Sequence, residues 1–348
     1  MPGLISTVAR GRARRAAAGL TVVATAALFT AVFTGTARAA YSGADGLIAF
    51  VRQANIYTIN PESPAPGSTV RRLTTDGHDA GPRWSPDGKH IAYLDRGNLW
   101  IMRANGSHKH RITGQAPGYT DARPSWSPNG RYLAFVKTRR GARSGYLTRY
   151  DTKTGRFATF STPFHSEQPT TRQIKVTALP AAVAWAWARD ATGVSHGSFI
   201  VFEGATAPRC PSGSYCLDAL GFGAQPDYRN GFPSAEDFTS QPLRLLDPDW
   251  YPNNPMFDVN VLTTQENCPA GHCSATGIDL TPGSAPILPG AYQAVYSPGG
   301  VYLAYVRNHH GTPEIYLYSP PGIVPLPSHA LTAGTQPDWQ PVRPAPVT

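Results

Sequence analysis

Two aspartates occupy the same place in two similar stretches of the sequence. Asp79 lies five residues before Trp84, Asp121 lies five residues before Trp126, and His78 directly precedes Asp79. Carboxylates and an imidazole on one rim would suit a cation or the cationic end of a ligand. Aspartates also end turns without any ligand, which explains the two carboxylates more simply. We therefore treat His78, Asp79 and Asp121 as ligand-binding candidates, with turn capping as the alternative.

The pair of aspartates does not extend into a ring of charge. The other stretches of this kind carry uncharged residues at the same offset, namely Ala182, Leu245, Ala291 and Gly334. A ring of carboxylates around a central channel is therefore not expected. We predict neither a metal site nor a cofactor.

Signatures of catalysis are scarce in the chain. One stretch, GVSHG at 193–197, matches G-x-S-x-G, but we expect no strand-turn-helix segment that could make it a nucleophile elbow. The sequence contains no H-E-x-x-H, no P-loop and no dinucleotide-binding glycine pattern. The only histidine clusters, His309-His310 and His108-x-His110, fall in expected surface hairpins, where solvated side chains are the simpler reading. We predict no catalytic residue and a protein that is not an enzyme.

The four cysteines form two tight pairs, Cys210 with Cys216 and Cys268 with Cys273. An even number of cysteines in an exported chain is typical of disulfides. We expect each pair to close a bond within its own loop. Pairing between the two loops and a zinc site remain alternatives, although structural zinc sites usually have tighter ligand spacing.

A repeated motif has to position these residues. Trp84 opens WSPDGKHIAYL, and 42 residues later Trp126 opens WSPNGRYLAFV. Asp-Gly and Asn-Gly are strong hairpin signals because both residues tolerate a positive φ angle, and the alternating apolar residues that follow indicate a buried strand. Weaker copies open at Tyr296, Trp250, Trp187 and Trp339. Six copies of a unit with four short strands predict an all-β, six-bladed β-propeller.

The two ends of the motif series complement one another. The last copy, at Trp339, has no strand after it, and the apolar run 47–51 has no motif before it. We expect the N-terminal strand to close the C-terminal blade, which leaves no open sheet edge. An open β-sandwich with coincidental tryptophan spacing is the alternative fold.

The first 39 residues have the three parts of a secretory signal. Four arginines between positions 10 and 15 precede an uncharged stretch, 16–37, and Ala37-Arg38-Ala39 suits cleavage before Ala40. A retained membrane anchor is the alternative. We expect a signal peptide at 1–39 and the propeller at 40–348. Cleavage removes five arginines, so the formal charge falls from +9 to +4, which makes nucleic acid a poor partner.

The motifs together resemble a known repeat family. NIYTIN from Asn55, the two motifs at Trp84 and Trp126, and GTQPDWQP from Gly334 resemble the TolB-type WD40-like repeats. The resemblance implies a propeller, although TolB proteins carry an additional N-terminal domain that we do not expect here. It favours an exported, non-enzymatic module that binds a protein, a peptide or a cell-envelope polymer through its loops or channel mouth. The alternative is an extracellular hydrolase or lyase acting on a polysaccharide.

Further expectations about the mature protein follow from the same reading. We expect it to be secreted or held in the cell envelope, monomeric, and without a membrane span after signal cleavage.

Overall fold

The computed structural model describes most of the chain after residue 43. The described residues are 44–114, 117–142, 144–162, 172–173, 175–176, 182–189, 195–203, 217–222, 243–250, 261–267, 274–279, 286–319 and 329–342. All of them belong to one compact unit, Thr36–Thr348. The predicted signal peptide, 1–39, lies outside the described residues, and so do all four cysteines. The only helix among the described residues, η1 (Pro66–Thr69), is a single 3-10 turn, and none of them forms a helix able to cross a membrane.

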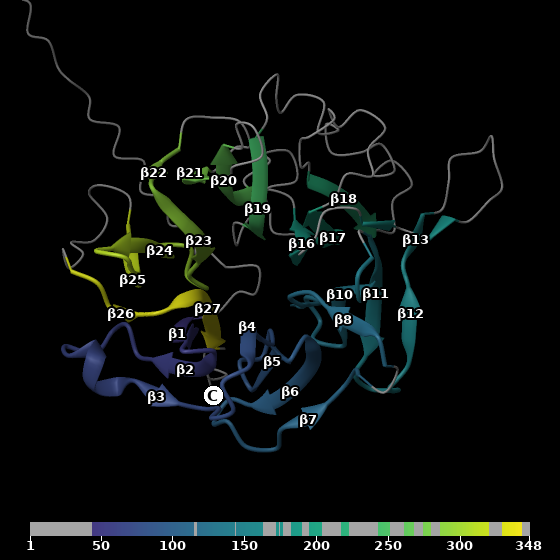
Figure 1. Cartoon of the computed structure of the whole chain (residues 1–348), viewed down its shortest axis with the longest axis horizontal. Helices are drawn as coiled ribbons and strands as arrows, with labels where there is room; N and C mark the ends of the chain where they lie inside the picture. The colour runs from purple at the N-terminus through teal and green to yellow at the C-terminus, as the bar shows by residue number, and fades with distance from the viewer. Residues whose placement is uncertain are drawn as a thin grey trace, which may run out of the picture. The chain divides into compact units, whose positions relative to one another are not determined.

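Antiparallel strands make up the rest, so the all-β prediction is confirmed. Most strands belong to sheets that stand around a common centre (Figure 1), and each of these sheets is named here after one of its strands. The β1 sheet contains β27 (Thr335–Val342), β1 (Ala44–Arg52), β2 (Asn55–Ile59) and β3 (Arg71–Arg72). The β4 sheet contains β4 (Asp79–Trp84), β5 (His90–Asp95), β6 (Asn98–Arg103) and β7 (His110–Arg111). The β10 sheet contains β8 (Tyr119–Asp121), β9 (Ser125–Trp126), β10 (Tyr132–Arg139), β11 (Gly145–Asp151), β12 (Phe157–Thr159) and β15 (Lys175–Val176).

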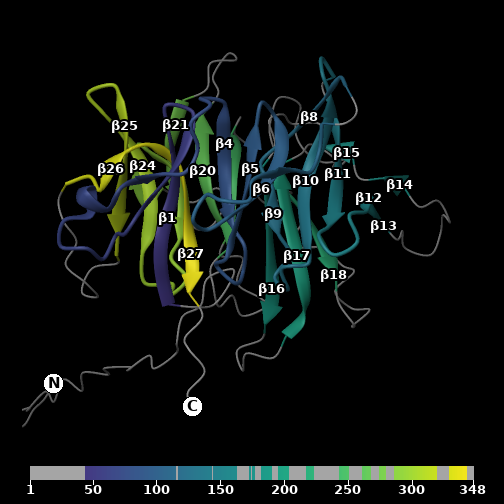
Figure 2. The same cartoon turned by 90° about the horizontal axis from the view of Figure 1, so that it is seen from below.

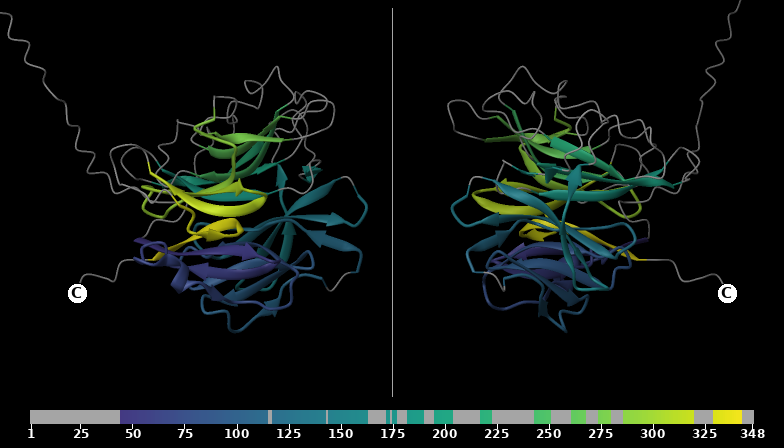
Figure 3. Two further views of the ribbon diagram at one scale, coloured as in Figure 1. Left: turned by 60° about the vertical axis from the view of Figure 1, so that its left-hand side comes forward. Right: turned by 90° about the vertical axis from the view of Figure 1, so that its right-hand side faces the viewer.

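The second half of the chain continues the arrangement. The β16 sheet contains β16 (Val183–Arg189), β17 (Ser195–Glu203) and β18 (Leu217–Phe222). The β19 sheet contains β19 (Leu243–Trp250), β20 (Val261–Asn267), β21 (Ser274–Asp279) and β22 (Leu288–Pro289). The β23 sheet contains β23 (Ala291–Tyr296), β24 (Leu303–His309), β25 (Thr312–Tyr318) and β26 (Thr332–Ala333). A separate pair is formed by β13 (Ser161–Thr162) and β14 (Arg172–Gln173). Figure 3 shows the sheets from two further sides.

The prediction of six blades is wrong, and the structure is a five-bladed propeller. Five sheets of the described residues have four or more strands, which is the number that a propeller blade contains. Among the described residues, the segment with the expected opening at Trp187 gives the three-stranded β16 sheet. Its sequence has a physical reason for the difference. No Ser-Pro-x-Gly turn follows Trp187, and the alternating apolar strand that follows this turn in the regular copies is delayed there until residue 198, whereas the Trp250 copy keeps the proline and a turn pair, Asn253-Asn254.

That turn is built in the same way in the regular copies. Between β4 and β5, the Gly88 N–H donates to the Ser85 carbonyl at 2.8 Å, and the Ser85 hydroxyl bonds the Asp87 carboxylate at 2.6 Å. Gly88 has a φ of +67°, which costs glycine little. Residues 127–130 and 297–300 form the same backbone bond, between the glycine N–H and the serine carbonyl. The motif therefore fixes where each innermost hairpin turns.

The aromatic residue of the motif packs across to the preceding sheet. Four of these aromatics each share a core cluster with the alanine of an Ile-Ala or Leu-Ala pair in the preceding sheet. The small alanine side chain leaves room for an indole ring. The pairs are Ala49 with Trp84, Ala92 with Trp126, Ala134 with Trp185 and Ala304 with Trp339. In the β16 sheet this place belongs to Trp185, and the expected opening at Trp187 is therefore two residues off.

The chain ends meet as predicted. Strand β1 pairs with β27, with Ile48 opposite Trp339, and the two strands lie side by side in Figure 2. The Trp339 side chain is buried and stacks on Tyr302 with ring centroids 6.1 Å apart. The Leu47 N–H donates to the Gln340 side chain at 3.1 Å. The closure of the C-terminal blade by the N-terminal strand is confirmed.

Candidate functional site

The innermost strands share a bulge three residues before the motif aromatic. The register slips between Ala80 and Arg83 in the β4 sheet, and the same slip occurs in the β19, β23 and β1 sheets. A β-bulge re-aims side chains, and proline is tolerated there because it has no N–H to donate. The residues at this position, here called the bulge residues, are Gly81, Arg123, Asp247, Gln293 and Gln336. Four of them have positive φ angles between +50° and +56°, namely Gly81, Asp247, Gln293 and Gln336.

The bulge residues join neighbouring sheets at the centre of the ring. The Gln336 N–H donates to the Gln293 amide oxygen at 3.0 Å, and the Gly81 N–H donates to the Gln336 amide oxygen at 2.6 Å. Arg123 forms an ion pair with Asp247, whose side chain is 8% exposed. A side chain at position 81 would collide with Arg123. Three other bulge residues adopt nearly the same φ angle with a side chain, so glycine at position 81 is explained by the path of Arg123.

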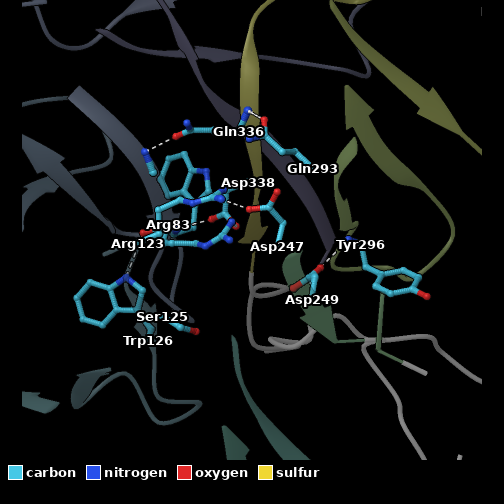
Figure 4. A network of polar contacts seen from close by, with 12 residues as sticks. Arg83, Arg123, Ser125, Trp126, Asp247, Asp249, Gln293, Tyr296, Gln336 and Asp338 are labelled. Atoms are coloured by element: carbon cyan, nitrogen blue, oxygen red, sulfur yellow. Dashed lines mark hydrogen bonds and ion pairs between the residues drawn. The ribbon is translucent and has the colours of Figure 1, made fainter. Parts of the chain in front are cut away.

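Residues directly before the motif aromatic form a second set of links. These residues, here called the anchor residues, are Arg83, Ser125, Asp249 and Asp338. Three of them accept a hydrogen bond from the backbone N–H of the next sheet's aromatic residue, as Figure 4 shows in part. The bonds run from Trp84 to Asp338 at 2.6 Å, from Trp185 to Ser125 at 2.9 Å and from Tyr296 to Asp249 at 2.8 Å. Side chains at the centre thus hold adjacent sheets in register.

Arg83, the anchor residue that does not accept such a bond, balances the charge of Asp338. Arg83 donates to Asp338 at 3.1 Å, and both side chains are less than one-fifth exposed. Burial raises the pKa of Asp338 to about 6, because removal of water disfavours the carboxylate, while the Arg83 charge lowers that pKa. Asp338 is therefore mainly ionised at neutral pH and forms a charged pair with Arg83.

A small cavity lies among these residues. Its lining includes the three indoles of Trp84, Trp126 and Trp185 together with Arg83 and Asp338. The cavity has a volume of about 30 Å³, which is room for one or two water molecules. Clefts that enclose small ligands usually measure about 300–1,000 Å³. A sugar chain does not fit inside this cavity without movement of the lining side chains.

The structure separates the aspartates that the sequence suggested as a pair. Asp79 and Asp121 are both buried, but neither lines the cavity. The Asp121 carboxylate accepts a hydrogen bond from Thr113. Asp79 instead lies close to Asp76 and Asp95. Each aspartate therefore sits at its own junction between two sheets.

The histidines take no part in the cavity. His78 is exposed, and its Nδ1 lies 2.7 Å from the Asp76 carbonyl oxygen. The clustered histidines are exposed as well, which agrees with their prediction as surface residues. His309 lies 3.5 Å from the Glu314 carboxylate.

Sequence reasoning missed the bulge and anchor residues because it examined the wrong offset. It compared the fifth position before each aromatic, whereas the side chains at the centre come from the third and the first. A signal for them is present as x-Pro-x-Trp, in residues 81–84, 123–126, 247–250 and 336–339. The disulfide prediction for the four cysteines lies outside the described residues and stays a prediction.

Comparisons with known proteins give only distant likenesses. No protein-family model matches the chain, and no curated protein matches it. TolB from Acinetobacter baumannii is 16% identical over 85% of this chain and 67% of that chain, with a TM-score of 0.49. An oligogalacturonate lyase in complex with manganese is 10% identical over 84% and 91% of the two chains, with a TM-score of 0.45. A nidogen/laminin complex is 9% identical over 85% and 99%, with a TM-score of 0.48. At these identities and TM-scores the likenesses carry no argument about function.

Proposed function

We propose that the chain is an exported, TolB-like propeller that binds a protein, peptide or envelope-polymer ligand at the rim of its central cavity. The carrying observation is the ion pair of Arg83 with Asp338, which stands beside three indoles in the cavity lining. Guanidinium groups, carboxylates and indoles are the groups that recognise peptide segments, because they offer both hydrogen bonds and apolar surface. Bonds to neighbouring sheets hold these groups in place before a ligand arrives, which lowers the entropic cost of binding.

The same contacts argue against chemistry at this site. Hydrolysis of a glycosidic bond needs a pair of carboxylates with different protonation, and metal-assisted cleavage needs a cluster of metal ligands. The two carboxylates in the cavity lining already accept backbone N–H groups, from Trp84 to Asp338 and from Tyr296 to Asp249. We therefore infer a structural and binding role for them. A polysaccharide hydrolase or lyase remains the competing function and is one outcome of the test below.

Export, disulfides and a monomeric state belong to this proposal. The arginine cluster, the uncharged stretch and Ala37-Arg38-Ala39 support export. N-terminal sequencing of the secreted protein is expected to start at or near Ala40. Peptide mapping without reduction is expected to find Cys210 joined to Cys216 and Cys268 joined to Cys273. Recovery of the full-length chain in the membrane fraction would contradict export.

The binding role is tested by capture of partners from the native cell surface with the mature protein, followed by mass spectrometry. The test variant is Arg123→Gln, which removes the charge that reaches Asp247 at the centre. The control is Lys153→Ala, an exposed position on the turn after β11. Near-ultraviolet circular dichroism and thermal melting establish that both variants are folded.

We expect Arg123→Gln to reduce capture of a specific partner at least about tenfold, equivalent to about 1.4 kcal/mol, and Lys153→Ala to leave it unchanged. Equal capture by all three proteins would contradict binding at the cavity rim. Cleavage of an envelope polysaccharide by the wild type would establish the competing function.

A further inference from the structure

Three carboxylates gather where the β1 sheet meets the β4 sheet. Oxygens of Asp76, Asp79 and Asp95 all lie within 4.8 Å of one another. Asp79 is only 2% exposed, Asp95 is half-buried and Asp76 is exposed. Neither carboxylate oxygen of Asp79 has a hydrogen-bond partner, although buried polar groups almost always have one. The Thr74 hydroxyl lies close enough to lower the pKa of Asp79 but does not meet hydrogen-bond geometry.

Hydrogen bonds tie the backbone around Asp79 to strand β2 and to the turn before it. The Asp79 N–H donates to the Ala54 carbonyl at 2.8 Å. The preceding loop is tied down by the Gly77 N–H, which donates to the Asn55 amide oxygen at 3.0 Å, and by Thr74, which accepts from the Ile56 N–H at 2.8 Å. The three carboxylates are thus held together by the fold.

Asp121 occupies the position equivalent to that of Asp79, five residues before the motif aromatic, but lies opposite a cation. Its N–H donates to the Gly97 carbonyl at 2.7 Å, as that of Asp79 does to Ala54, and Thr113 occupies the place of Thr74. Across the strands, however, Asp121 faces Lys137, whereas Asp79 faces Asp95. Like charges directly opposite one another destabilise a sheet. The Asp79 junction therefore lacks the cation that its counterpart carries as a lysine.

Side chains around the cluster do not supply this charge. Arg96 is the nearest cation, at 3.5 Å from Asp95, and its side chain is 57% exposed. His78 contacts Arg96 and the Asp76 carbonyl rather than a carboxylate. Three carboxylates against one guanidinium leave two negative charges, with the buried phenol of Tyr93 beside them.

The protonation of Asp79 reflects this imbalance. The pKa of Asp79 is raised to about 7, first by burial and then by the neighbouring carboxylates of Asp76 and Asp95. The pKa of Tyr93 is also raised, first by burial and then by the three carboxylates. A cation between the carboxylates would reverse the effect on Asp79 and keep it ionised.

We propose that Asp76, Asp79 and Asp95 bind a divalent cation of the calcium class at the junction of the β1 and β4 sheets. The ligand atoms are all carboxylate oxygens, which suit calcium, magnesium or manganese rather than zinc or copper. The uncompensated charge of two matches a divalent ion. The flexible coordination of calcium tolerates one buried and two accessible carboxylates better than the strict octahedron of magnesium. None of the three aspartates lines the central cavity. A test of this cation site is therefore independent of a test of the proposed function.

The test is calorimetric titration of CaCl2 into the mature protein after treatment with a chelator, with MgCl2 as the comparison ion. Variants Asp79→Asn and Asp95→Asn each remove one ligand charge, and Asp121→Asn is the matched control at the lysine-balanced junction. Terbium emission, sensitised by nearby aromatic rings such as Tyr93 and quenched by added calcium, gives a second readout. Asp95 is half-buried, so Asp95→Asn decides the matter if Asp79→Asn does not fold.

We expect one calcium ion to bind with a dissociation constant of about 0.1–1 mM, the range of extracellular modules. Asp79→Asn and Asp95→Asn should weaken binding at least about tenfold, a loss typical even of residues that only support a metal ligand. Asp121→Asn should leave binding unchanged. The proposal is overturned if calcium gives neither heat nor a rise in melting temperature. It is also overturned if the Asp95→Asn variant binds calcium as the wild type does.

Discussion

The carboxylate near the C-terminal end of β4 is paired with a cation, whereas the carboxylates near its N-terminal end are not. At its C-terminal end Arg83 pairs with Asp338, and that carboxylate also accepts the Trp84 N–H. At its N-terminal end the Asp79 carboxylate lies beside two further carboxylates and has no hydrogen-bond partner. Both ends are at junctions between the β1 and β4 sheets, and the whole strand is only six residues long.

The difference separates two kinds of site. Charges that are already paired across sheets organise a surface before any ligand arrives, and they have little need of an external ion. Carboxylates that are held together without a counter-charge raise the free energy of the folded protein until protons or a cation neutralise them. The first arrangement suits recognition of a partner, and the second suits an ion.

The largest expected loss of stability comes from removing the ion pair of Arg83 with Asp338 at the C-terminal end of β4. Arg83→Met removes the guanidinium and leaves the Asp338 carboxylate in a largely buried place. We expect the free energy of unfolding at pH 7 to fall by about 2–4 kcal/mol, because loss of one partner strands a buried charge. Chemical denaturation measures this value. A change below about 0.5 kcal/mol would show that the pair does not hold the sheets together.

The N-terminal end of β4, where Asp79 has no counter-charge, is expected to make the free energy of unfolding depend on pH. Asp79 has a folded-state pKa of about 7, raised mainly by burial, and an ordinary aspartate in the unfolded chain has a pKa of about 3.9. Between these values the folded protein holds a proton that the unfolded chain has lost, so stability falls as pH rises. The slope contributed by Asp79 is at most about 1.4 kcal/mol per pH unit. Asp338, with a pKa of about 6, adds a contribution of the same sign.

Denaturation between pH 4 and 8 in the presence of a chelator checks this dependence. We expect Asp79→Asn to flatten the profile, and the exposed control Lys153→Ala, which removes no carboxylate, to leave the slope between pH 6 and 7 as in the wild type. A wild-type profile without a decline over this interval would mean that the carboxylates near Asp79 do not repel one another.

A smaller effect is expected when the unpaired end is made to resemble the Asp121 junction. Asp95→Lys places a lysine opposite Asp79, as Lys137 stands opposite Asp121. Without a cation, we expect this change to stabilise the protein by about 0.2–1 kcal/mol, the value of an opposite-charge pair across strands. The melting temperature should then no longer respond to calcium. Destabilisation by Asp95→Lys in chelator would contradict the account of the like-charge pair.

Much of the fold could be predicted from the sequence because its information is local. The Ser-Pro-Asp-Gly turn after Trp84 fixes a hairpin by itself, with Gly88 at positive φ. The complementary ends, around Ile48 and Trp339, predicted the closing strand pair. The blade count was wrong at the third copy of the motif, which lacks this turn, and Trp187 was taken for the packed aromatic that the structure identifies as Trp185.

The sites depended on information that no single copy of the motif contains. Asp79 and Asp121 share an offset, but their surroundings differ in the residue across the strands, Asp95 or Lys137. That difference requires the strand register. The ion pair of Arg123 with Asp247 joins residues 124 positions apart, and the bulge that turns Asp247 inward is visible only in three dimensions.

The most direct test of the contrast between the two ends of β4 is one pair of melting temperatures. Asp338→Asn and Asp79→Asn each replace a buried carboxylate by an amide of the same shape, and both are measured beside wild type at pH 7.5 in chelator. We expect Asp338→Asn to melt below wild type, because Arg83 loses its charged partner, and Asp79→Asn to melt above it, because the remaining carboxylates are less crowded. Shifts of the same sign in both variants would contradict the account.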